Sequence, residues 1–157
     1  MEDKIIKVFT DGSCLRNGKK NAKAGIGIYF PNDFLNNISE EFTCSPITNQ
    51  RAELYAILVT LNLIVEKVEF DKIIVYTDSL YSIKCLTEWI KKWEKQEWKT
   101  STNKPVKNLD IILPIHKIIA KYNKKIVFKH VKSHTGKQDF KSKGNDKADK
   151  LATSAIK

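Results

Sequence analysis

Short apolar runs separated by polar joints alternate along the first third of the chain. Residues 4–10, 24–30 and 38–44 are rich in β-branched and aromatic side chains, which is typical of β-strands. The joints at 15–23 and 31–37 are polar and contain Gly, Pro and Asn, which favour turns. We therefore expect an antiparallel meander of three strands.

The apolar pattern then lengthens and predicts helices with two further strands between them. Residues 48–65 begin with polar Thr48 and are then apolar on nearly all faces, as in a helix packed in the interior. Residues 73–77 form an uninterrupted apolar run, as in a strand buried on both faces in parallel pairing. The remaining expected elements are a helix from Ser79, a helix over 109–122 interrupted near its start by Pro114, a strand over 125–131, a polar loop over 132–144 and a final helix over 145–156.

Five strands with helices after the third indicate an α/β layered fold with a mixed sheet. The length of 157 residues fits one domain, so we expect a single domain over residues 1–157 with no separate module before the first strand. Residues 89–108 differ in character from the rest, because three tryptophans lie there among many lysines. Pro105 ends any helix in that segment.

The charge of the chain suggests a polyanionic partner. The formal net charge is +10, and lysine supplies nearly all of the positive charge, because Arg16 and Arg51 are the only arginines. Nucleic acid is the leading candidate for such a partner. The alternative is that a lysine-rich surface serves solubility alone.

Cysteine usage and hydropathy bear on the compartment. Cys14, Cys44 and Cys85 are widely spaced and form no Cys-x-x-Cys pair, which argues against a disulfide framework or a zinc site and favours a reducing compartment. No apolar run approaches the length of a membrane span, and no signal-like segment precedes the first strand. We expect a soluble intracellular protein of the cytoplasm, with the nucleus as the alternative.

Two aspartates follow apolar strands in the same local pattern. Residues 4–13 and 72–79 each end an apolar run with Thr-Asp and then Gly or Ser, so Asp11 and Asp78 should emerge at the carboxyl ends of their strands. Ligands of open α/β sheets bind at that edge, and two acids there suit a hard cation. The alternative for either residue alone is an ordinary turn or N-cap aspartate.

Four segments taken together resemble type 1 ribonuclease H. They are Phe9-Thr10-Asp11-Gly12-Ser13, Thr48-Asn49-Gln50-Arg51-Ala52-Glu53, Tyr76-Thr77-Asp78-Ser79 and Asn145-Asp146-Lys147-Ala148-Asp149-Lys150-Leu151-Ala152. Their order and spacing match that family, and the resemblance covers essentially the whole chain. Glu53 alone would be unremarkable, since glutamate is common in a first helical turn. The resemblance implies a ribonuclease H-like fold, with strands 1–3 antiparallel and strands 1, 4 and 5 parallel.

The resemblance implies a metal site formed by Asp11, Glu53, Asp78 and Asp149. These acids would bind two Mg²⁺ ions, with Mn²⁺ as a substitute, and phosphodiester hydrolysis by in-line displacement suits two such ions. Asp146 lies three residues before Asp149 and hence near the same helix face, but the family pattern Asn-x-x-Ala-Asp assigns the ligand to Asp149. Asp146 would then support the site indirectly.

His134 corresponds to a histidine that the family carries in a mobile loop. The implied role is proton transfer to the leaving group or help with product release, whereas the plain alternative is a solvated loop histidine. This chain departs from the family here, because more residues than usual separate His134 from Asp149, and the extra ones lie in 136–144. His116 and His130 match no catalytic position and are interpreted as structural.

The resemblance also implies two sides of a substrate groove. Residues implied to approach 2′-hydroxyls and bases of the RNA strand are Cys14, Asn17, Asn49, Gln50 and Glu53. Residues implied to line the side of the DNA strand, partly on a basic protrusion over about 89–108, are Thr48, Tyr81, Trp89, Trp93, Ser101 and Asn108. Aromatics at helical spacing are more often core residues, but lysines between them favour a nucleic-acid groove. Pro46 stands where the family usually has an arginine for a DNA phosphate.

The function implied is an endonuclease that hydrolyses the RNA strand of RNA/DNA hybrids and leaves 5′-phosphate and 3′-hydroxyl ends. We expect a monomer whose partner is the RNA/DNA hybrid, with no membrane contact. Two alternatives stay open at this point: a non-catalytic hybrid-binding module and another nuclease of the same superfamily, such as an integrase or an exonuclease.

Overall fold

The apolar runs pair into one mixed sheet in a computed structural model that describes residues 3–157. The strand order is β3-β2-β1-β4-β5. The pairs β3–β2 and β2–β1 are antiparallel, and the pairs β1–β4 and β4–β5 are parallel. This confirms the predicted sheet. The strands of the described chain are β1 (Ile5–Leu15), β2 (Lys23–Tyr29), β3 (Ile38–Phe42), β4 (Lys72–Thr77) and β5 (Ile126–His130).

Asp11 lies within a strand, not at the end of one, which corrects the expectation from the sequence. β1 continues to Leu15 because its antiparallel pairing with β2 extends to the pair Leu15–Lys23. Its parallel pairing with β4, however, ends at Thr10–Thr77. Asp11 and Asp78 therefore leave the parallel part of the sheet side by side, and the prediction that they meet at one edge holds for that reason.

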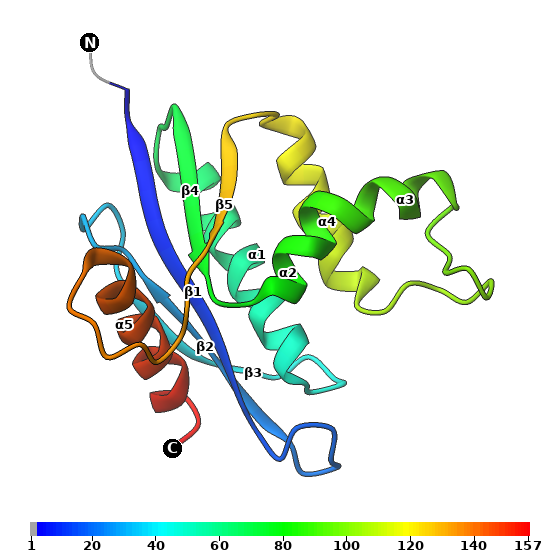
Figure 1. Cartoon of the computed structure of the whole chain (residues 1–157), viewed down its shortest axis with the longest axis horizontal. Coiled ribbons are helices and arrows are strands. Elements are labelled where there is room, and N and C mark those ends of the chain that lie inside the picture. Colours follow the sequence, from blue (N-terminus) through cyan, green and yellow to red (C-terminus); the bar gives the residue numbers. More distant parts are fainter. Residues whose placement is uncertain (1–2) are drawn as a thin grey trace.

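Helices cover the two faces of the sheet unequally (Figure 1). The helix α1 packs on β1 and β2 and, together with α4, encloses the larger core, whereas α5 packs against β1, β2 and β3 on the other face. None of the helices in residues 3–157 has the length and apolarity needed to span a bilayer. The helical segments are α1 (Asn49–Lys67), α2 (Leu80–Lys84), the π-helical η1 (Cys85–Trp89), α3 (Ile90–Lys95), α4 (Leu109–Lys121) and α5 (Phe140–Ser154).

Two helix predictions need correction. The helix α5 begins at Phe140, five residues earlier than expected, because the side chain of Asp139 caps it by accepting a hydrogen bond of 2.8 Å from the Ser142 N–H. Pro114 does not interrupt α4. Its ring removes one backbone hydrogen bond, but Ile112 and Ile115 on either side are fully buried and hold the helix against the core.

The helix α5 approaches the sheet closely at Gly27 of β2. A Cβ atom at this position would lie 2.0 Å from the carbonyl oxygen of Ala148, so no larger residue fits without moving the helix. We expect Gly27→Ala to destabilise the protein by roughly 1–3 kcal/mol, as overpacking does, and to shift the helix that carries Asp149. Denaturant unfolding measures the loss; Gly18→Asn, at a loop position with open space but with a φ of 81° that strains a side chain, is the control and should cost less stability than Gly27→Ala.

Candidate metal centre

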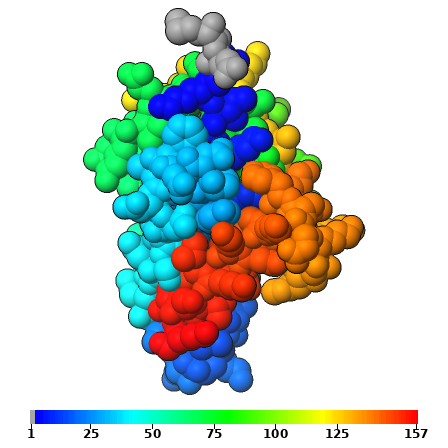
Figure 2. Space-filling view, turned by 90° about the vertical axis from the view of Figure 1, so that its left-hand side faces the viewer, coloured from blue at the N-terminus to red at the C-terminus, as the bar shows by residue number. Residues whose placement is uncertain are grey.

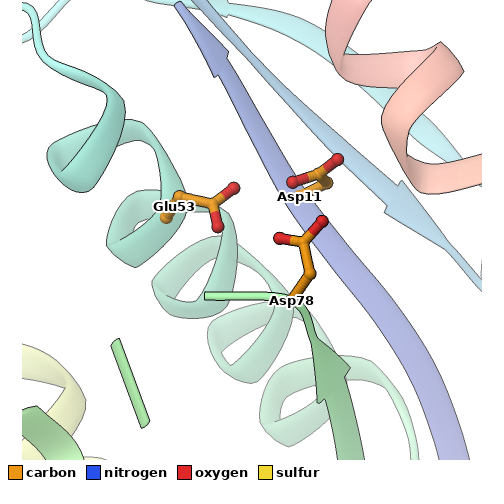
Figure 3. Close-up of side chains that lie close together, drawn as sticks. All are labelled: Asp11, Glu53 and Asp78. Carbon is orange, nitrogen blue, oxygen red and sulfur yellow. The ribbon is translucent and has the colours of Figure 1, made fainter. Parts of the chain in front are cut away.

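Three carboxylates from separate elements point toward one another (Figure 3). Asp11 extends from β1, Glu53 from α1 and Asp78 from the residue after β4. One oxygen of each lies within 4.8 Å of the others, and among residues 3–157 this is the group of His, Cys, Asp and Glu side chains close enough to share a metal ion. The structure therefore brings together three of the four predicted acids.

A glycine brings Glu53 against the strand. A Cβ atom on Gly12 would lie 2.6 Å from the backbone nitrogen of Glu53, so β1 and α1 are nearly in backbone contact. The Gly12 N–H donates hydrogen bonds to the carboxylates of both Asp11 and Glu53. At the start of the helix, the Thr48 hydroxyl oxygen accepts from the Arg51 N–H at 3.2 Å and fixes where α1 begins.

Burial and mutual repulsion make ionisation of this cluster costly. The pKa of Asp11 is raised, first by burial and then by the negative charges of Glu53, Asp78 and Asp149. Burial also raises the pKa of Glu53, and the charge of Asp78 adds to the effect. Burial raises the pKa of Asp78 as well, against hydrogen bonds that favour its charged form. Carboxylates held this way are neutralised by a divalent cation, and hard cations prefer oxygen ligands.

Asp149 lies near this cluster but outside it. It is half-buried on α5, and its negative charge contributes to the raised pKa values of Asp11 and Asp78. It does not belong to the group of three whose oxygens lie within 4.8 Å of one another. Its role as fourth ligand stays a prediction, which this proximity supports. Asp146, one turn earlier, is also half-buried.

Asn145 is a site residue that the sequence reasoning did not single out. It is 2% exposed, and its side chain lies beside the Asp78 carboxylate, where it favours the charged form and so opposes the rise in the pKa of that group. It precedes Asp149 by four residues, so both extend from one face of α5. The pattern Asn-x-x-Ala-Asp includes this asparagine, but the pattern alone does not indicate which residue its side chain contacts.

His134 is not brought into contact with the acids. It is exposed and has a φ of 54°, and within residues 3–157 its side chain makes no hydrogen bond or ion pair. Its catalytic role stays a prediction. His116 is structural as expected, because its Nε2 lies 3.2 Å from Glu94 and its ring packs edge-on against Trp98.

The residues predicted to face the RNA strand surround the start of α1. The Asn17 side-chain oxygen accepts a hydrogen bond of 3.1 Å from the Asn49 N–H, which joins the β1–β2 turn to the helix. Gln50 is exposed beside them, and Cys14 is half-buried on β1, where burial raises the pKa of its thiol. Three of the four residues therefore lie on the elements that carry Asp11 and Glu53, and Asn17 lies in the turn directly after β1.

Most residues predicted to face the DNA strand form a connected row. The ring of Tyr81 lies 5.9 Å from that of Trp89, which lies 6.0 Å from that of Trp93. The Asn108 side chain donates to the Tyr81 hydroxyl at 2.9 Å. Trp89 is 37% exposed. Trp93 is half-buried against the main core, as expected if aromatics at helical spacing are core residues. Ser101 is exposed, and among the described residues its side chain makes no hydrogen bond to this row.

Arg51 connects this row to α1, and no feature of the sequence pattern indicated that role. Its guanidinium is 3% exposed and contacts both carboxylate oxygens of Asp110, at 2.8 and 2.7 Å. It also donates to the side-chain oxygen of Asn108 at 3.4 Å. Pro46, where the family usually has an arginine, shares a hollow with Lys19 and Lys20 of the β1–β2 turn.

Without metal ions, the repulsion within the acid cluster should lower the stability of the folded protein. Because the folded-state pKa of Asp11 is raised above its ordinary value of 3.8, its ionisation opposes folding, and stability falls as pH rises from that value towards the raised one. In EDTA at pH 8 we therefore expect Asp11→Asn to melt at a higher temperature than wild type, by roughly 2–4 °C for each kcal/mol of relieved repulsion. Added Mg²⁺ should stabilise wild type more than the variant; equal melting curves in EDTA would contradict the prediction.

Comparisons with known proteins agree with this geometry. A family model described as RNase H matches residues 3–157. The chain is 44% identical over 145 residues to a ribonuclease H of Schizosaccharomyces pombe, covering 92% of this chain and 50% of that protein. Thus the chain spans about half the length of several curated relatives that it matches.

Solved structures support the fold. The solution structure of the PFV RNase H domain has a TM-score of 0.79 and 25% identity, covering 99% of this chain and 96% of that one. LC11-RNase H1, solved in complex with RNA/DNA hybrid, has a TM-score of 0.61 and 24% identity over 96% of each chain.

Proposed function

Because the chain belongs to the RNase H family, of type 1, we propose that it is a metal-dependent endonuclease that hydrolyses the RNA strand of RNA/DNA hybrids and leaves 5′-phosphate and 3′-hydroxyl ends. The observation that carries the proposal is the convergence of Asp11, Glu53 and Asp78 within 4.8 Å. A relative of the same fold was solved in complex with RNA/DNA hybrid, which supports the same substrate here.

The RNase H family uses divalent metal ions, and the acidic cluster fits them. We propose two Mg²⁺ ions, replaceable by Mn²⁺, held by the three clustered acids with Asp149 as the fourth ligand. When bound, such ions supply a nucleophilic hydroxide and stabilise charge on the departing 3′ oxygen. The buried, mutually repelling carboxylates support this assignment, since they have little other means of neutralisation.

The side chains around the acids keep the reacting groups in place. The Gly12 N–H orients the carboxylates of Asp11 and Glu53, and Asn145 orients Asp78. His134, in the exposed loop after β5, is proposed to transfer a proton to the leaving 3′ oxygen once substrate covers the site. In this arrangement the scissile phosphate lies over the acids, between the start of α1 and the end of β4.

The two sides of the site suit different strands. The row of Asn17, Asn49 and Gln50 offers polar groups that can exchange hydrogen bonds with a 2′-hydroxyl, which only RNA carries. The aromatic row of Tyr81 and Trp89 offers surfaces to a deoxyribose backbone, and the nearby lysines contribute salt-dependent affinity. Specificity would then come from strand geometry, with little reading of bases.

The test is a comparison of substrates. Wild-type protein in Mg²⁺ should cleave the RNA of a hybrid and leave double-stranded DNA, double-stranded RNA and single-stranded RNA intact. A non-catalytic binding module would bind the hybrid without cutting it, and another nuclease of the superfamily would cut one of the other substrates. The buried acids speak against a pure binding module, because unneutralised carboxylates beside phosphates weaken binding.

The exposed tryptophan of the aromatic row should matter for binding, not for folding. We expect Trp89→Ala to raise KM for the hybrid several-fold while kcat and melting temperature change little, because uniform binding is lost. Trp98→Ala is the matched control: its ring packs on His116 and the core, so it should lower the melting temperature. A large fall in melting temperature for Trp89→Ala, with KM unchanged, would assign Trp89 to the core.

Two further properties are part of the proposal. We propose that the domain acts as a monomer, since its groove residues all come from one chain. We also propose a reducing compartment, the cytoplasm or the nucleus, because the three cysteines at 14, 44 and 85 are free thiols.

A further inference from the structure

Lysines surround a hollow at the turn between β5 and α5, which we call the β5–α5 corner (residues 130–142). The hollow measures about 230 Å³, and Lys132, Lys137 and Lys141 line it. Asp139 lines it too, but its carboxylate is engaged as the cap of α5. Three ammonium groups therefore share one small hollow with a single acid among the lining residues that the structure describes.

Hydrogen bonds give the corner a defined shape. The Thr135 hydroxyl donates to the Ser142 hydroxyl oxygen at 2.7 Å, and Ser142 is itself buried. The Lys137 N–H donates to the Thr135 hydroxyl oxygen at 3.2 Å. These contacts tie the backbone at Lys137 to the first turn of α5, which also carries Lys141, and both lysines line the hollow.

Both ends of the corner are fixed to the sheet next to the acids. The Val131 N–H donates to the Thr77 carbonyl at 3.0 Å, one residue before Asp78. At the other end, the Phe140 ring lies 5.3 Å from that of Phe9, two residues before Asp11. The corner is therefore attached to the two strands that carry catalytic aspartates.

The corner lies on the opposite side of β1 from the protrusion that begins at α3 (Figure 1). It stands out from the surface beside α5 (Figure 2). From Phe140 to Asp149 the helix rises roughly 13 Å, at 1.5 Å per residue. Successive phosphates of one strand advance about 3.4 Å along a duplex axis, so this distance corresponds to about four nucleotides of a strand that runs along α5.

We propose that Lys132, Lys137 and Lys141 bind phosphates of the RNA strand about four nucleotides from the cut, on the side away from the protrusion. The inference rests on the proposed function, because it takes the strand over the acids to be RNA. Three like charges around one hollow repel one another, and a polyanion relieves that repulsion. The RNA strand is favoured over the DNA strand because the corner adjoins the acids, whereas the aromatic row lies across the site.

The test measures equilibrium binding in an Asp11→Asn background, so that no cleavage interferes. The variant is Lys132, Lys137 and Lys141 all changed to Gln. The control changes Lys67, Lys117 and Lys125 to Gln, which removes the same amount of charge at exposed positions. Lys67 is the last residue of α1, Lys117 lies in the last part of α4, and Lys125 directly precedes β5. Both are compared on hybrids extended on either side of a fixed site, and on hybrids whose extension is single-stranded RNA or single-stranded DNA.

We expect the corner variant to bind roughly tenfold more weakly than its background on hybrids extended towards the corner, with a salt slope smaller by about 2 to 3. The difference should vanish when that extension is removed, persist when it is single-stranded RNA and be absent when it is single-stranded DNA. The control should match the background throughout. An unchanged slope, or equal losses on extended and truncated hybrids, would overturn the proposal; a loss that follows the DNA extension would overturn the strand assignment.

Failure of the proposed function would look different. Wild-type protein that binds hybrid without cutting it would refute the nuclease and leave the binding result for the corner intact. Melting curves of the lysine variant accompany the binding data, and we expect them to match the background because the three side chains are exposed.

Discussion

Replacing Asp11 or Asp78 with Asn is expected to abolish cleavage of the hybrid. Each carboxylate lies in the cluster of three, and an amide lacks the charge that a divalent ion requires. The loss of a metal ligand should raise the barrier by several kcal/mol, which lowers kcat by about three orders of magnitude or more. Hybrid binding should stay measurable, because the lysines and the aromatic row are unchanged.

Cleavage rates in Mg²⁺, with binding measured in parallel, check this expectation. Asp33→Asn is a matched control, because Asp33 is exposed in the turn after β2 and its φ of 57° is one that asparagine tolerates. Turnover by either site variant within about tenfold of wild type would refute the assignment of the acids.

Asp149→Asn should be far more damaging than Asp146→Asn. Both residues are half-buried on α5, but the negative charge of Asp149 adds to the raised pKa values of Asp11 and Asp78, and the pattern Asn-x-x-Ala-Asp assigns the ligand to Asp149. We expect a fall in kcat of about a hundredfold or more for Asp149→Asn and less than about threefold for Asp146→Asn.

Rates for the two variants side by side decide the matter, because the substitutions are chemically identical and lie on one helix. Their melting temperatures serve as the control for packing of α5 against Gly27. Equal losses in rate would mean that α5 presents a different face to the site.

The apolar and polar pattern predicted a mixed sheet and the order of its elements, and the resemblance to type 1 ribonuclease H added Glu53 to the acids that meet there. Strand and helix patterns arise between neighbouring residues, so the alternation of apolar and polar positions was enough to locate β1, β4 and α1. The Thr-Asp pairs predicted that Asp11 and Asp78 would lie together, and the cluster confirms it.

Local pattern was less reliable at the ends of elements. β1 runs on past Asp11 because β2 offers it a partner as far as Leu15, and α5 starts at Phe140 because Asp139 caps it and the Phe140 ring packs on Phe9. The contact of Phe140 with Phe9 joins residues distant in the sequence, which a local window does not include, whereas the Asp139 cap and the pairing of Leu15 with Lys23 are local.

Tertiary structure alone decided the distances within the site. Three contacts join residues far apart in the chain. Gly12 lies against α1, α5 packs directly on Gly27, and the Asn145 side chain lies beside Asp78. His134 and Ser101 are exposed, and their roles at the site stay predictions. Such distances follow from how side chains of different elements fill one core, and close packing is a property of the whole fold that no single segment encodes.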